Sequence, residues 1–112
     1  MRQWCYVGKL QFDNGADSSI LHNKNLRHAT ALMFITGALV GTVTIKGSPD
    51  SDSDVTPSSD LYVGTTQVSV PASKTTIWES AGGMCSLMAH SSGTETTAAV
   101  DVYARIDMDA SS

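Results

Sequence analysis

Charged side chains are scarce in this sequence. They make up 16% of the 112 residues, whereas about 25% is usual for a soluble domain. Seven Lys or Arg residues against eleven Asp or Glu residues give a formal charge of −4. A protein that binds a phosphate backbone needs a basic patch, and the sequence has none, so we expect no nucleic-acid partner. Ser and Thr replace the missing charge, and such a surface favours strands and turns over helices.

Cysteines and long apolar runs are also sparse. Cys5 and Cys85 are far apart and have no Cys-x-x-Cys spacing, which argues against a zinc site or a thioredoxin-like motif. We expect two free thiols, with a disulfide between them as the alternative. The longest apolar run, residues 31–35 extended to 40, is too short for a membrane span, and the first residues lack the apolar core of a signal peptide. We therefore expect a soluble protein, made in the cytoplasm, with no membrane partner.

Alternation of apolar and polar residues dominates the rest of the chain. Within residues 41–47, Val43 and Ile45 fall on one side, and Thr42 and Thr44 fall on the other, which is typical of a strand with one buried face. We predict one all-β domain over residues 1–112, an antiparallel β-sandwich, either jelly-roll-like or immunoglobulin-like, with seven or eight strands. The predicted strands are residues 3–12, 31–35, 39–47, 61–63, 67–70, 74–79, 84–89 and 98–107.

The first and last strands carry specific expectations. In the first, one parity predicts an aromatic face inside the core, formed by Trp4, Tyr6, Leu10 and Phe12. In the last, alternation predicts four inward residues, Val100, Val102, Ala104 and Ile106. We expect this closing strand to pair with residues 39–47, and residues 108–112 to form a frayed tail.

The connecting segments are less regular. Residues 16–30 show little periodicity and predict an irregular crossing loop with a short helical turn around residues 19–23. A helix over residues 26–35 competes with the strand at 31–35. Gly64 stands where a bulge or turn would change the parity of the apolar residues. Residues 91–93, Ser-Ser-Gly, predict another turn.

An acidic loop is predicted at residues 48–59, where Asp50, Asp52 and Asp54 alternate. Oxygen ligands at this spacing can hold calcium, but the helix-loop-helix calcium motif also needs a Gly and a distal acid at two positions that Val55 and Leu61 occupy here. Another calcium geometry remains an alternative. We favour a solvated loop whose charges protect a sheet edge from pairing with other chains.

No catalytic, metal or cofactor site is predicted. His22, His28 and His90 show no metal-ligand spacing. The nucleophile motif Gly-x-Ser-x-Gly is absent, and no basic neighbour would activate the Cys85 thiol. We therefore do not expect an enzyme.

Surface contacts offer better candidates. Strands with apolar residues on both faces carry more apolar surface than one sheet can hide, which favours packing between subunits. The candidate interface residues are Met33, Ile35, Met84, Met88, Tyr103 and Arg105. Arg105 could equally be an ordinary cross-strand charge partner. Trp78 and Tyr62 could stack on sugar rings if exposed, and burial is the alternative for Trp78.

Two stretches resemble a known family. Residues 41–50, Gly-Thr-Val-Thr-Ile-Lys-Gly-Ser-Pro-Asp, and residues 92–106, Ser-Gly-Thr-Glu-Thr-Thr-Ala-Ala-Val-Asp-Val-Tyr-Ala-Arg-Ile, look like the small β-sandwich virion proteins of tailed bacteriophages. The resemblance implies a repeated structural piece of a virus particle, either a capsid decoration (cement) protein on the head or a neck or tail component. It implies as partners other copies of the chain, most simply in a trimer, and the major capsid protein or other virion proteins. The location would be the virion.

Overall fold

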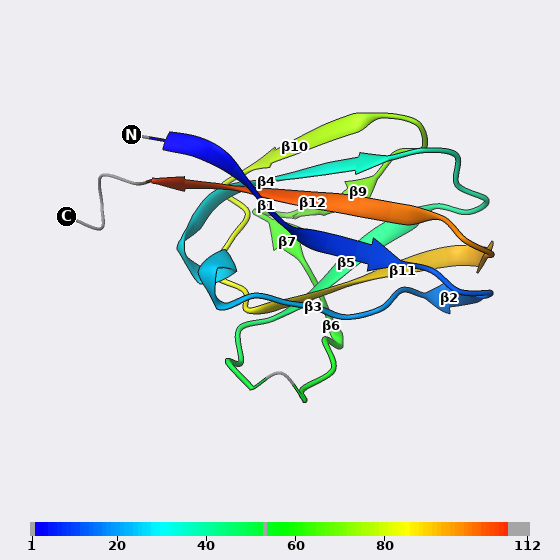
Figure 1. The fold of residues 1–112 in the computed structure, drawn as a ribbon, viewed down its shortest axis with the longest axis horizontal. Helices are drawn as coiled ribbons and strands as arrows, with labels where there is room; N and C mark the ends of the chain where they lie inside the picture. Colours follow the sequence, from blue (N-terminus) through cyan, green and yellow to red (C-terminus); the bar gives the residue numbers. More distant parts are fainter. Residues whose placement is uncertain (1, 53, 108–112) are drawn as a thin grey trace.

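The computed structural model describes residues 2–52 and 54–107, and its two antiparallel sheets confirm the predicted all-β sandwich (Figure 1). The first sheet has the strand order β1 (Arg2–Gln11), β12 (Ala99–Asp107), β4 (Ala29–Thr36) and β10 (Thr75–Glu79). The second has the order β2 (Gly15–Asp17), β11 (Ser86–Glu95), β5 (Val43–Ser48) and β6 (Ser59–Asp60), with β3 (Leu21–His22) against β11 and β9 (Ser69–Val70) against β5. A small hairpin joins β7 (Tyr62–Val63) to β8 (Thr66–Gln67), and its turn contains Gly64 at φ 64°. The strands are more numerous than predicted.

The core lies between the two sheets and consists of the inward residues of both. Val43 and Ile45 of β5 are fully buried, as their alternation predicts. In β12 the expected inward set is also confirmed, since three of its members are fully buried and Ile106 packs against the core. The opposing sheets contribute the largest fully buried side chains, which include Leu10, Phe12, Leu32, Phe34 and Leu87.

A bulge in β1 reverses the expected direction of its aromatic residues. Tyr6 is opposite Tyr103 of β12 but Gly8 is opposite Val102, so Val7 is an extra residue and the parity changes there. Gly8 adopts φ 142°, a conformation that L side chains rarely take. Leu10 and Phe12 point into the core as predicted, but Tyr6 is 54% exposed and Trp4 is only partly buried. The prediction of a continuous inward aromatic face was therefore wrong.

The strand that begins the acidic loop also has a different partner. β5 pairs with β11, β6 and β9 in the second sheet, whereas β12 pairs with β1 and β4 in the first. The predicted pairing of residues 39–47 with the closing strand was wrong, because alternation identifies a buried face without identifying the neighbouring strand.

The crossing segment is more ordered than predicted. Residues 16–30 contain the end of β2, all of β3 and a 3-10 helix, η1, at Lys24–His28. This helix begins after Asn23, whose side chain accepts a hydrogen bond from the Asn25 N–H, so the expected helical turn at 19–23 was misplaced. Residues 31–35 belong to β4, which excludes the competing helix.

The turn predicted at residues 91–93 was wrong, because β11 continues through them to Glu95. Ser91 is buried within that strand, and its hydroxyl donates to the Glu95 carboxylate at 2.8 Å and accepts from the Gly93 N–H at 3.1 Å. Ser91 and Glu95, in this part of β11, are thus buried and joined by a hydrogen bond.

The acidic loop extends from the end of β5 to the start of β6 and projects from the sandwich at the bottom of Figure 1. Asp50 and Asp52 each accept a hydrogen bond at 2.9 Å from the backbone N–H two residues later. These contacts are Asx turns, and they account for the alternating spacing through the local loop backbone. Ser53 and the predicted tail at 108–112 lie outside the described residues.

Candidate functional site: the outer face of the four-stranded sheet

The four-stranded sheet presents aromatic and apolar side chains on its outer face. The strand register forms two neighbouring rows there, Trp4–Arg105–Ala31–Glu79 and Tyr6–Tyr103–Met33–Ile77. Because successive side chains of a strand point to opposite faces, these residues face away from the core residues Leu32, Phe34, Val102 and Ala104. We call these eight residues, together with Ile35 and Asp101 of the next row, the outer sheet face.

Arg105 organises the first row. Its guanidinium contacts the Glu79 carboxylate with both terminal nitrogens, and the Nη1 to Oε2 distance is 2.9 Å. Its Nε donates to Thr30 Oγ1 at 3.2 Å, and its Cζ lies 5.8 Å from the centroid of the Trp4 ring. The ion pair spans Ala31, which is fully buried although it lies on the outer side of β4. Arg105 is therefore a cross-strand charge partner, one of the two roles considered from the sequence.

Tyr6 and Tyr103 form the aromatic part of the second row. Their ring centroids are 5.2 Å apart in an edge-to-face arrangement. The Tyr6 hydroxyl donates to Asp101 Oδ1 at 3.2 Å. Partial desolvation raises the pKa of Tyr6, and the negative charge of Asp101 raises it further. The sequence analysis predicted that Tyr6 lies in the core. A prediction of the bulge at Gly8 would have been needed to assign Tyr6 to the outer face.

The six candidate interface residues do not share one surface. Met33, Ile35, Tyr103 and Arg105 lie together on the outer sheet face, whereas Met88 belongs to the second sheet and Met84 lies outside the strands. Met84 precedes β11 and lies against Gly47. Met88 is within β11 and only 8% exposed.

The two candidate ligand-stacking aromatics are also in different environments. Trp78 is partly buried against the core, and its indole N–H donates to the Ser69 carbonyl at 3.0 Å. The burial considered for Trp78 is therefore the better description. Tyr62 is 53% exposed on the β7–β8 hairpin and is available for contact.

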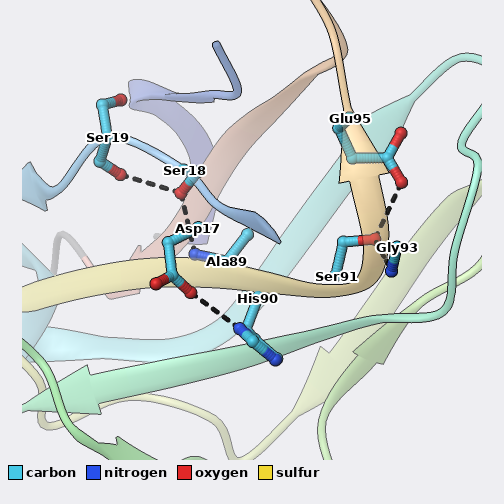
Figure 2. A network of polar contacts seen from close by, with 8 residues as sticks. All are labelled: Asp17, Ser18, Ser19, Ala89, His90, Ser91, Gly93 and Glu95. Atoms are coloured by element: carbon cyan, nitrogen blue, oxygen red, sulfur yellow. Dashed lines mark hydrogen bonds and ion pairs between the residues drawn. The ribbon is translucent and has the colours of Figure 1, made fainter. Parts of the chain in front are cut away.

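The second sheet carries polar contacts on several strands (Figure 2). His90 Nδ1 lies 2.7 Å from Asp17 Oδ1, and both side chains are exposed. His22 Nδ1 lies 2.8 Å from Ser86 Oγ, but Ser86 is fully buried and cannot meet a substrate as a nucleophile. His28 is exposed in η1. Within residues 2–52 and 54–107, no three His, Cys, Asp or Glu side chains gather where they could hold a metal ion.

Glu95, which the sequence analysis did not single out, has the most unusual environment. It is 1% exposed, and its carboxylate accepts hydrogen bonds from the N–H groups of Val40 and Gly41 and from the Ser91 hydroxyl, at 2.8–3.0 Å. Figure 2 shows the contact with Ser91. Burial raises the pKa of Glu95, but the three donors outweigh it and leave the pKa below its usual value. This carboxylate fastens the segment between β4 and β5 to β11, which is a structural task.

Comparisons with known proteins add no family to this description. No protein-family model matches the sequence, and no curated protein matches it. Among the described residues, no helix is long and apolar enough to cross a membrane.

Proposed function

We propose that this protein is a non-enzymatic structural component of a tailed-bacteriophage particle, most simply a capsid decoration protein. It would be made in the host cytoplasm and then act in the virion, through contacts with other copies of itself and with the major capsid protein. The resemblance of residues 41–50 and 92–106 to small β-sandwich virion proteins supports this assignment, and a compact antiparallel sandwich is compatible with it.

The observation that carries the proposal is the outer sheet face. It places two exposed apolar side chains, Tyr6 at 54% and Ile77 at 51%, in one row with Tyr103 and Met33. An apolar row of this kind is suited to contact with another protein. The neighbouring Arg105–Glu79 pair supplies a polar margin, as is usual at the rim of an interface.

The location of the protein in particles tests the proposal. Purified virions of the phage that encodes the chain are labelled with an antibody raised against it and viewed by electron microscopy. We expect label distributed over the head. Label confined to the neck or tail would support the alternative position in the particle, and absence of the chain from purified virions would overturn the structural assignment.

A matched pair of variants tests whether the outer sheet face makes the contact. Met33→Lys places a charge in the middle of the apolar row, and Tyr62→Lys places one on the separate β7–β8 hairpin. Circular dichroism and unfolding curves establish that both variants fold. We expect Met33→Lys to be depleted from particles and Tyr62→Lys to be incorporated like the unaltered protein. Equal incorporation of both variants would exclude this face.

A carbohydrate-binding module is the second candidate, and exposed aromatic residues favour it. Tyr62 is more than half exposed, and the Tyr6–Tyr103 pair lies beside the carboxylate of Asp101, so rings and polar groups occur together. Binding on a glycan array that is lost with Tyr103→Ala or Tyr62→Ala would favour this function. An array without binding would exclude it for the glycans tested.

A further inference from the structure

The two edges of the four-stranded sheet are open over stretches of similar length. Within the part of the chain that the structure describes, β1 pairs with β12 alone and β10 pairs with β4 alone. The second half of the β1 edge is closed, because Ser19 N–H donates to the Gln11 carbonyl at 2.7 Å and Asn23 Nδ2 donates to the Val7 carbonyl at 3.4 Å. Among the described residues, no backbone group pairs with the outer side of residues 2–6 or of residues 75–78 of β10. Both edges therefore present backbone donors and acceptors to an incoming strand.

Both open edges carry an exposed apolar residue in the same row. Tyr6 on β1 is 54% exposed, Ile77 on β10 is 51% exposed, and Tyr103 and Met33 separate them along the row. A second sheet placed edge to edge in register would bring Ile77 of one copy beside Tyr6 of the next. Such apolar and aromatic cross-strand pairs stabilise sheets.

Strand direction favours the same arrangement. Every neighbouring pair in the order β1-β12-β4-β10 is antiparallel, so β1 and β10 run in opposite directions. A copy added edge to edge in the same orientation therefore places its β1 antiparallel to β10 of the first copy. The sheet continues with no change of pattern.

Charge distinguishes this head-to-tail junction from pairing of β1 with itself. In the first row Glu79 lies on β10, and Arg105 lies on β12 next to β1. A β10–β1 junction in register places Glu79 of one copy about two strand spacings, roughly 10 Å, from Arg105 of the next. The charges along the row then alternate in sign. Pairing β1 with β1 around Trp4 instead leaves two Arg105 side chains facing each other across about three strand spacings, roughly 14 Å, with no acidic residue of the row between them.

We propose that copies of this chain associate head to tail, with β10 of one copy adding as a strand to residues 2–6 of β1 in the next. The interface is heterologous, so repetition gives a closed ring or an open chain of copies, and the trimer considered above would be a ring of three. The inference rests on the self-association that the proposed function requires, and it names the surface that performs it.

Complementation between two edge variants tests the junction. Tyr6→Lys places a charge at the β1 edge and leaves β10 intact, and Ile77→Lys does the reverse. Tyr62→Lys is the matched control, because Tyr62 is as exposed as Tyr6 but lies on the hairpin. Light scattering after size-exclusion chromatography measures association, and circular dichroism establishes that each variant folds.

We expect each edge variant alone to weaken self-association by about tenfold or more and the control to associate like the unaltered protein. An equimolar mixture of the two edge variants should form a discrete heterodimer, since the intact β10 of Tyr6→Lys meets the intact β1 of Ile77→Lys. If Ile77→Lys still self-associates and the mixture forms no heterodimer, β1 pairs with itself and the head-to-tail arrangement is wrong. An unchanged oligomer in both variants, or an unaltered protein that stays monomeric, also overturns it.

Particle incorporation separates this result from the proposed function. Variants that lose self-association are tested for their presence in purified virions. If the unaltered protein is incorporated into virions and both edge variants still self-associate, the virion role stands and the edge junction is rejected. If the two edge variants form the heterodimer but the chain is absent from virions, the edge junction stands and the virion role is rejected.

Discussion

Glu95 on β11 accepts a hydrogen bond at 2.8 Å from the backbone N–H of Gly41, in the segment that joins β4 to β5. The two residues belong to parts of the chain that are 54 positions apart. Gly41 is also packed closely, because a Cβ there would lie 2.5 Å from the Gly93 nitrogen. The contact therefore holds the connection between the two sheets against β11 of the second sheet and fixes the path of that connection.

Replacing Glu95 with Gln should lower stability. The amide has one oxygen acceptor in place of two, and its NH₂ group would face the N–H groups of Val40 and Gly41. Hydrogen bonds to a charged group contribute about 1.5–3 kcal/mol each, so we expect a loss of about 3 kcal/mol in the free energy of unfolding. Urea unfolding measures it. Asp50→Asn is the control, because Asp50 is exposed and its carboxylate accepts a hydrogen bond from the Asp52 N–H in the same loop. A Glu95→Gln protein as stable as the control would show that the carboxylate does not hold the segment.

Acid should destabilise the protein through the same residue. The pKa of Glu95 is lower in the folded state than its usual value, so the unfolded chain binds more protons as the pH falls through that interval. The contribution of Glu95 is complete above the unfolded pKa, about 4.3, and is lost as the pH falls through the folded pKa. We expect Glu95→Gln to flatten this part of the stability curve, measured by urea unfolding from pH 7 to pH 3. Identical curves for the two proteins would contradict the assignment.

The sequence was sufficient to predict the sandwich and several buried faces, because the alternation of apolar and polar residues indicates which face of a strand is buried. Val43 and Ile45, and likewise Val100 and Val102, are fully buried as their spacing requires. Partner strands could not be predicted in this way. β5 and β12 have similar patterns yet belong to different sheets, since pairing depends on the path of the whole chain.

The candidate surface was only partly predictable for a related reason. Met33, Ile35, Tyr103 and Arg105 were identified because they alternate with core residues. Tyr6 and Ile77 were missed as surface residues. For Tyr6 the cause is the extra residue Val7, which reverses the face to which the preceding residues of β1 point. Gly8 is the local feature of the sequence that indicates this bulge.

Gly8→Ala should therefore be costly. The position has φ 142°, and an added Cβ would lie 2.0 Å from Leu21 Cδ1. Backbone strain and displacement of a core side chain together should cost about 2–4 kcal/mol of the free energy of unfolding. Gly37→Ala is the matched control, since nothing lies within 4 Å of its Cβ position, and we expect a change within about 0.5 kcal/mol. Thermal and urea unfolding of both variants measure the difference. Equal stabilities would mean that the bulge adapts to a side chain.

The two cysteines should differ in reactivity. Both are free, but Cys85 is fully buried and Cys5 is only partly buried on β1, near the open edge. A thiol reagent reaches a buried cysteine only when the structure opens, so we expect one fast thiol and one whose reaction follows unfolding. Labelling of Cys5→Ser and Cys85→Ser proteins with a chromogenic disulfide reagent, with and without urea, assigns each phase. If Cys85 reacts as fast as Cys5 in the folded protein, β11 opens locally at its start. Slower labelling of Cys5 at high protein concentration is expected if β1 pairs with a second copy.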